Sequence, residues 1–252
     1  MGASTKKIVL EKWNNYFTGI SLPIAVFYSN KLNGAEYVGK PVENPKGYTC
    51  IFAQMSKLHR GQSVAFDVNN LGCFGSIQTI FGGLYDEDRV VELFVNIEHF
   101  KKDREQVAAM YHTNPKAGLT GKYLIMKPYD QLTEEDCPEI VILFTKPDVI
   151  SAMHCLMSFD DTRVDTMIVP FGSGCEQLLS FAFNECKQTN ARAVLGGMDL
   201  AMRGCVKENL QTLSIPHTRF IQMVHNMDES FLSTYIWKAI KPRVVKNATK
   251  MH

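Results

Sequence analysis

The stretch Thr166-Met167-Ile168-Val169-Pro170-Phe171-Gly172-Ser173-Gly174-Cys175 decides the expected fold, because an apolar run ends there in a glycine turn. A long helix is predicted to start at Cys175 and to continue to Asn184 or beyond. A strand, a turn and a helix in direct succession are the unit from which α/β proteins are built. The uninterrupted apolar run 139–145 predicts a buried strand. We therefore expect an α/β fold with a mixed sheet covered by helices.

The same alternation runs through the rest of the chain, where apolar spacing separates helices from strands. Further strands are predicted at 22–28, 63–67, 123–126, 193–195 and 213–215. Helices are predicted at 8–17, 50–59, 74–81, 87–100, 104–111, 149–157 and 218–237, the last one interrupted near Asp228.

Residues 20–130 resemble residues 138–237 in their order of features. Each half has a strand, then a helix with a cysteine (Cys50 or Cys155), then a second strand, 64–66 or 167–169. A Gly-Cys pair follows that second strand in both halves, as Gly72-Cys73 and Gly174-Cys175. No linker-like composition separates the halves, so the sequence predicts one domain, 1–252, made of two pseudo-duplicated lobes. The alternative is that any two α/β units look alike.

Composition indicates a globular protein with a sizeable core, since 45% of the 252 residues are hydrophobic and 21% are charged. The formal charge of +1 argues against binding to nucleic acid or to anionic membranes. The polar N-terminal residues do not resemble a signal peptide, and the apolar runs are too short to span a bilayer. A cytoplasmic protein is expected.

Seven cysteines, an odd number without a secretory context, are expected to be thiols or metal ligands rather than disulfides. Cys73 and Cys175 each follow a glycine at a predicted helix N-terminus, where backbone N–H groups and the helix dipole stabilise a thiolate. A pseudo-twofold axis would bring them together with Cys50 and Cys155, and four thiolates suit an iron–sulfur cluster or zinc. Against this, no Cys-x-x-Cys motif occurs, and a buried cysteine is often simple packing. We expect Cys155 to lie in the core.

The glycine turn itself allows two further interpretations. Gly172, Ser173 and Gly174 resemble a phosphate-binding loop, although the Lys-Ser/Thr end of a P-loop is missing, and a structural turn is the alternative. Cys175 also stands where an acyl-transfer enzyme of the strand–turn–helix type places its nucleophile, but no histidine partner can be assigned.

Asp199 and Arg203 are four residues apart and would share one face of a helical turn. Two interpretations are open. The pair is either a surface ion pair or a clamp in which Arg203, oriented by Asp199, binds an anionic ligand.

Several of these motifs together resemble the domain-of-unknown-function 169 family, a group of prokaryotic proteins common in anaerobes and archaea. The resemblance covers roughly residues 22–237, and Phe171-Gly172-Ser173-Gly174-Cys175 is its most specific element. The other matching stretches are Thr49-Cys50, Leu71-Gly72-Cys73-Phe74-Gly75, the segment from Gly196 to Arg203, and Asp228-Glu229-Ser230-Phe231.

The resemblance implies little about activity, because the family is defined without one. Many relatives have proline where this chain has Phe74, and Cys155 is not part of the family pattern. This departure leaves Cys50, Cys73 and Cys175 as the expected ligands, and three protein ligands leave a fourth position open for substrate.

The leading hypothesis is a protein that binds an iron–sulfur cluster or another thiolate-ligated metal through Cys50, Cys73 and Cys175, with a redox or small-molecule role. One rival is an anion-binding module that uses Gly72, Gly172, Ser173, Gly174 and Arg203. The other is a thiol enzyme with Cys175 as its nucleophile. A small-molecule ligand or a redox partner is expected, neither nucleic acid nor a membrane is, and a homo-oligomer is left open.

Overall fold

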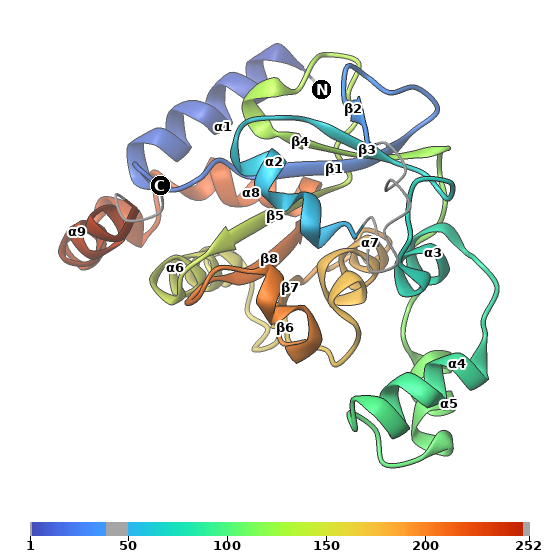
Figure 1. Cartoon of the computed structure of the whole chain (residues 1–252). Helices are drawn as coiled ribbons and strands as arrows, with labels where there is room; N and C mark the ends of the chain where they lie inside the picture. Colours follow the sequence, from blue (N-terminus) through green and yellow to red (C-terminus); the bar gives the residue numbers. More distant parts are fainter. Residues whose placement is uncertain (1, 39–49, 249–252) are drawn as a thin grey trace.

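The computed structural model describes residues 2–38 and 50–248, in which eight strands form one mixed sheet with helices on both faces (Figure 1). The expected α/β fold is confirmed. The strands are β1 (Ile24–Ser29), β2 (Glu36–Tyr37), β3 (Val64–Phe66), β4 (Tyr123–Pro128), β5 (Ile140–Thr145), β6 (Met167–Ile168), β7 (Ala193–Gly196) and β8 (Gln211–Pro216).

The helical segments of the same residues include two π-helical stretches, η2 and η4, and several single 3-10 turns. They are α1 (Ala3–Tyr16), η1 (Phe52–Gln54), α2 (Met55–His59), α3 (Phe74–Phe81), α4 (Glu87–Val91), η2 (Glu92–Ile97), α5 (Arg104–Thr113), η3 (Tyr129–Gln131), α6 (Pro147–Met157), η4 (Glu176–Ser180), α7 (Phe181–Glu185), η5 (Leu200–Cys205), α8 (His217–Asn226), η6 (Phe231–Ser233) and α9 (Tyr235–Ala248). No described helix is both long and apolar enough to cross a membrane.

Alternating side chains of the central strands divide the interior into two cores. In β1, Val26 faces the core that is shared with α2, α3 and α7, whereas Phe27 faces the core shared with α1, α6 and α8. Both side chains are almost fully buried. The sheet is therefore a middle layer between two layers of helices, as expected for a sheet with both faces covered.

The sheet has the same strand order on both sides of the β1–β5 pair. The order is β2-β3-β4-β1-β5-β8-β7-β6, with a parallel pair at each outer end and antiparallel pairs elsewhere. At the centre Ala25 pairs with Val141, and the neighbouring pairs Ile24↔Ile142 and Val26↔Ile140 are exchanged by a twofold rotation. Ile24 and Ile140 likewise pair with Pro128 and Pro216 in the two outer ladders. The two halves of the sheet are thus related by a pseudo-twofold axis that passes between Ala25 and Val141.

This symmetry corrects the equivalence expected between the two halves. The sequence matched 64–66 with 167–169, but β3 takes the place of β7, and β6 takes the place of the short β2. β2 was not predicted. β6 is also shorter than the expected strand 166–171, because Pro170 has no N–H for the ladder and Val169 is exposed.

Residues 87–113 depart from the symmetry. Here α4, η2 and α5 form a helical hairpin that lies away from the sheet, beyond α3 (Figure 1). In the other half, η5 is followed after five residues by β8, so no comparable hairpin is present in that described segment. Asp86 and Asp103 cap α4 and α5 by accepting the backbone N–H of Arg89 and of Gln106. The hairpin is an addition to one half only.

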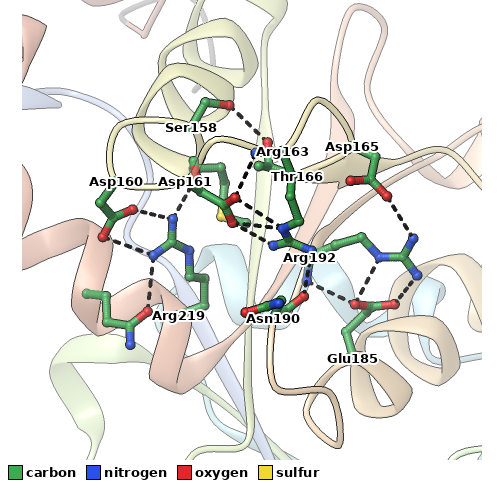
Figure 2. Close-up of polar contacts among 12 residues, drawn as sticks. Ser158, Asp160, Asp161, Arg163, Asp165, Thr166, Glu185, Asn190, Arg192 and Arg219 are labelled. Atoms are coloured by element: carbon green, nitrogen blue, oxygen red, sulfur yellow. Dashed lines mark hydrogen bonds and ion pairs between the residues drawn. The ribbon is translucent and has the colours of Figure 1, made fainter.

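A network of ion pairs holds the segments around β6 and β7 (Figure 2). Each of three arginines is paired with its own carboxylate at 2.6 or 2.7 Å: Arg163 with Asp161, Arg192 with Glu185, and Arg219 with Asp160. Because Glu185 is buried, its pair with Arg192 ties the end of α7 to the start of β7.

Candidate functional site

Cys50, Cys73 and Cys175 line one cavity of about 210 Å³ on the α2–α3–α7 side of the sheet. Cys50 stands two residues before η1, Cys73 is the N-cap of α3, and Cys175 immediately precedes η4. Segments far apart in the chain thus bring together the three sulfurs that the sequence grouped. Of the three thiols, only Cys175 is buried, while the other two are partly exposed.

The pseudo-twofold axis explains why these segments meet. The connection from β2 to β3 carries Cys50, and the equivalent connection from β6 to β7 carries Cys175. In the next connection of each half, Cys73 caps α3 and Asp199 caps η5, and Asp199 also lines the cavity. The cavity is therefore lined from two pairs of corresponding connections. Three of these four connections contribute a thiol, and the fourth contributes the carboxylate of Asp199.

The turn before Cys175 is fixed by two carboxylates. Glu176 accepts the Ser173 N–H at 2.8 Å, and the Ser173 hydroxyl accepts the Glu176 N–H at 3.4 Å, which is the reciprocal arrangement of a capping box. Asp199 accepts the Gly174 N–H at 2.7 Å. A side chain at Gly174 would place its Cβ 2.6 Å from Met202 Cγ, so only glycine allows this close approach.

The same hydrogen bonds count against the anion loop. The Ser173 and Gly174 N–H groups that would hold a phosphate already donate to carboxylates. Gly72 is exposed and is not among the residues that line the cavity, and neither is Gly172, whose carbonyl accepts the Gln177 amide at 3.0 Å. An anion would also meet the negative charges of Glu176 and Asp199.

Arg203 does not pair with Asp199 among the ion pairs of the described residues. Its guanidinium instead donates to the backbone carbonyl of Leu210 at 2.7 Å and to that of Gly197 at 3.4 Å. Asp199 uses its second oxygen to accept the Ala201 N–H at 3.0 Å. The expected pair is wrong because each partner finds a nearer backbone group, and Arg203 holds the turn after β7.

The thiols influence one another's pKa electrostatically. Burial raises the pKa of Cys175 well above the ordinary thiol value, and the charges of Cys73 and Cys50 raise it further. The Ser76 hydroxyl, 3.0 Å from the Cys175 sulfur, opposes this rise. Burial likewise raises the pKa of Cys50, and Cys73 and Cys205 add to the rise, whereas backbone hydrogen bonds lower it. Without a positive group nearby, the sulfurs of Cys175 and Cys50 favour the protonated form.

The other cysteines are separate from this site. Cys155 was expected in the core, but it lies on the exposed side of α6, and so does not complete a four-cysteine set. Cys137, Cys186 and Cys205 are exposed as well. Cys205, at the end of η5, is near enough to Cys50 to affect its pKa, although it does not line the cavity.

A single metal ion needs its ligand atoms around one point, with Zn–S distances of about 2.3 Å. Within residues 2–38 and 50–248, no group of three or more His, Cys, Asp or Glu side chains has that arrangement. An iron–sulfur cluster spreads its thiolate ligands over several iron atoms and so accepts sulfurs that stand farther apart. The donor set, three sulfurs that line one cavity, is of the thiolate type that clusters use.

The remaining walls of the cavity are mostly apolar. Phe52 and Met202 come from η1 and η5, and Phe74 comes from α3. The hairpin supplies the opposite wall, with Val90, Leu93, Phe94, Glu98, Met110 and Tyr111. Arg89 contacts the Phe74 ring from α4, with its guanidinium carbon 4.5 Å from the ring centroid. The sequence did not predict these hairpin residues as part of the site, because the apolar face of an amphipathic helix does not indicate which part of the protein it packs against.

A second hollow, of about 730 Å³, is lined by part of the ion-pair network of Figure 2, namely Asp160, Asp161, Arg163 and Arg219, and by neighbouring polar residues such as Gln188. Its walls are polar, and Arg163 and Arg219 already bind Asp161 and Asp160. This hollow holds none of the candidate site residues predicted from the sequence.

The fold and the cavity define a class of protein: a pseudo-symmetric α/β sheet with three thiols from separate segments around an apolar cavity. Residues 21–226 match the model of the domain-of-unknown-function 169 family (DUF169), described as "Uncharacterised ArCR". The chain belongs to that family. No curated protein and no solved structure matched the chain.

Proposed function

We propose that this protein binds an iron–sulfur cluster, or another thiolate-ligated metal centre, through Cys50, Cys73 and Cys175. The observation that carries the proposal is that these three thiols, from three separate segments, line one cavity. Packing alone explains a buried cysteine such as Cys175, but it does not explain why three cysteines from separate segments line one cavity.

The electrostatics of the cavity support a positively charged occupant. Burial raises the pKa of Cys175 and the charges of Cys73 and Cys50 raise it further, while Asp199 and Glu176 add negative charge nearby. No Lys, Arg or His is among the described residues that line the cavity. A metal centre supplies the missing positive charge and stabilises thiolates that would otherwise be protonated.

Under this proposal the chain has three separate tasks. Cys50, Cys73 and Cys175 hold the centre, and the Ser76 hydroxyl hydrogen-bonds the Cys175 sulfur. Asp199 and Glu176 fix the turn that presents Cys175. When bound, such a centre supplies one-electron transfer or an open coordination position for a small molecule.

The two rival functions have less support. A nucleophilic Cys175 needs a lowered pKa and a base, whereas burial raises its pKa and no histidine is among the described cavity residues. An anion-binding module needs free N–H groups and a free arginine, and here these groups already have partners. The metal centre also gives a role to Cys50 and Cys73, which both rivals leave unexplained.

The test is purification without oxygen, followed by iron and acid-labile sulfide analysis and by electron paramagnetic resonance before and after reduction. We expect a brown protein whose iron is lost in Cys73→Ala and Cys175→Ala. The matched controls are Cys137→Ala and Cys155→Ala, which remove exposed thiols outside the cavity and should keep the iron. A colourless wild-type protein without bound metal would contradict the proposal.

The wider setting of the proposal follows from its chemistry. A thiolate-ligated cluster suits a reducing, cytoplasmic compartment and an anaerobic cell. A redox partner would exchange electrons with the centre, or a small molecule would bind at its open coordination position.

A further inference from the structure

The hairpin 87–113, which lies away from the sheet beyond α3, supplies one wall of the cavity of the three thiols. Leu93 and Phe94 of η2 and Met110 of α5 belong to this wall, and Phe52 and Met202 of the main body line the same cavity. Cation–π contacts hold the hairpin against the body, from Arg89 to Phe74 and from Lys101 to Phe171, at 4.5 and 4.2 Å to the ring centroids. The part of the chain that breaks the pseudo-symmetry thus supplies the wall that the symmetric halves lack.

The chemistry of this wall differs from that of the thiol side. The hairpin residues lining the cavity are apolar or aromatic, except for Glu98. Burial raises the pKa of Glu98, and the charge of Asp199 across the cavity raises it further. A negatively charged ligand would meet these two carboxylates together with Glu176, without a described lining cation to balance its charge.

We propose that the cavity binds a small apolar molecule without negative charge, no larger than a single ring, and that the hairpin selects it. The volume of about 210 Å³, which the ligand would share with the centre on the thiols, sets this upper limit, because an apolar cavity of about 150 Å³ accommodates benzene. The ligand would lie between the hairpin wall and the thiols. This proposal names the ligand class of the proposed centre and rests on that function for the role of the thiols.

The test is ligand-observed NMR titration of the full-length protein, purified without oxygen, with toluene and with benzoate. The two probes have the same ring and differ in charge. We expect saturable toluene binding and at least tenfold weaker benzoate binding. Equal binding of both probes, or no saturable toluene binding, would overturn the proposal.

Two tryptophan variants locate the bound probe. Leu93→Trp fills the cavity from the hairpin and should weaken toluene binding at least tenfold. Leu84→Trp is the matched control, because Leu84 is 94% exposed, precedes the hairpin and does not line the cavity. If Leu93→Trp does not fold, as judged by thermal unfolding, Val90→Trp on α4 takes its place. Unchanged toluene binding in the folded variant would also overturn the inference.

Iron analysis of the same samples separates this proposal from the proposed function. Toluene binding in a protein without metal would contradict the metal centre and keep the ligand class. Bound iron without toluene binding would keep the metal centre and contradict the ligand class.

Discussion

The Asp199 carboxylate accepts a hydrogen bond of 2.7 Å from the backbone N–H of Gly174, the residue before Cys175. This contact joins the turn after β7 to the turn after β6, and the latter leads directly into Cys175. One carboxylate therefore fixes the position of a sulfur that it does not need to touch.

We expect Asp199→Ala to lower the free energy of unfolding by about 1–2 kcal/mol, since a cap and a charge-assisted hydrogen bond are lost. Metal content and the rate of Cys175 alkylation should change as well, because the turn is released. The control is Asp86→Ala, which removes the N-cap of α4 on the hairpin. Urea unfolding should show a similar loss for the control, with metal content unchanged. If both variants keep their metal, Asp199 is only a helix cap.

Gly174→Ala and Gly204→Ala form a matched pair of substitutions. A Cβ at Gly174 would lie 2.6 Å from Met202 Cγ and 3.1 Å from the Phe52 ring, so we expect a loss of about 1–3 kcal/mol in the free energy of unfolding. A Cβ at Gly204 meets nothing within 4 Å, so alanine there should be neutral or slightly stabilising. Thermal unfolding of both variants measures the difference. Equal effects would mean that the approach of η5 to the turn is looser than the structure has it.

The thiols should differ in their reaction with iodoacetamide in protein from which metal has been removed. Because burial raises the pKa of Cys175, it should react last at pH 7–8, after the exposed Cys137 and Cys155. The raised pKa also means that the folded state holds the Cys175 proton more tightly than the unfolded state does. This contribution to stability is present at neutral pH and is lost as the pH rises above about 9. Peptide mass spectrometry gives the order of labelling, and early labelling of Cys175 would argue for a thiol enzyme.

His217 should give the protein a pH dependence on the acid side. Burial lowers its pKa to about 4, and its ring contacts the Tyr129 hydroxyl at 2.9 Å. The unfolded chain binds this proton near pH 6.5, so stability is lost as the pH falls from about 6.5 to about 4. The loss reaches about 3 kcal/mol. Urea unfolding at several pH values should show this slope, and His217→Gln should flatten it. An unchanged slope in the variant would place the titration elsewhere.

Much of the fold could be predicted from the sequence, because strands such as 139–145 are continuous apolar runs and the helices have clear spacing. β2 was missed, since two exposed residues, Glu36 and Tyr37, give no periodicity. The match of 64–66 with 167–169 was wrong for a different reason. Strand order depends on pairing across the sheet, which the residues of one strand do not encode.

The candidate site was predictable in its thiols and not in its surroundings. The glycine before Cys73 and Cys175 marked both positions, and the structure brings them together with Cys50. Asp199 was noticed for a pairing with Arg203 that does not form, because competition with backbone groups is invisible in sequence spacing. Ser76, only three residues after Cys73, could have been found by reading the α3 turn as part of the site.

The antiparallel ladder between β1 and β5 has a consequence for how the molecule could be taken apart. A chain cut between Glu134 and Glu135 would give two fragments, one with β1 and the other with β5 as an unpaired edge strand. The two edge strands have complementary register. The buried pair of Lys127 and Asp136, 2.9 Å apart, would then join one fragment to the other. Co-expressed fragments should reassemble, and either fragment alone has the strand geometry to form a symmetric dimer with a copy of itself.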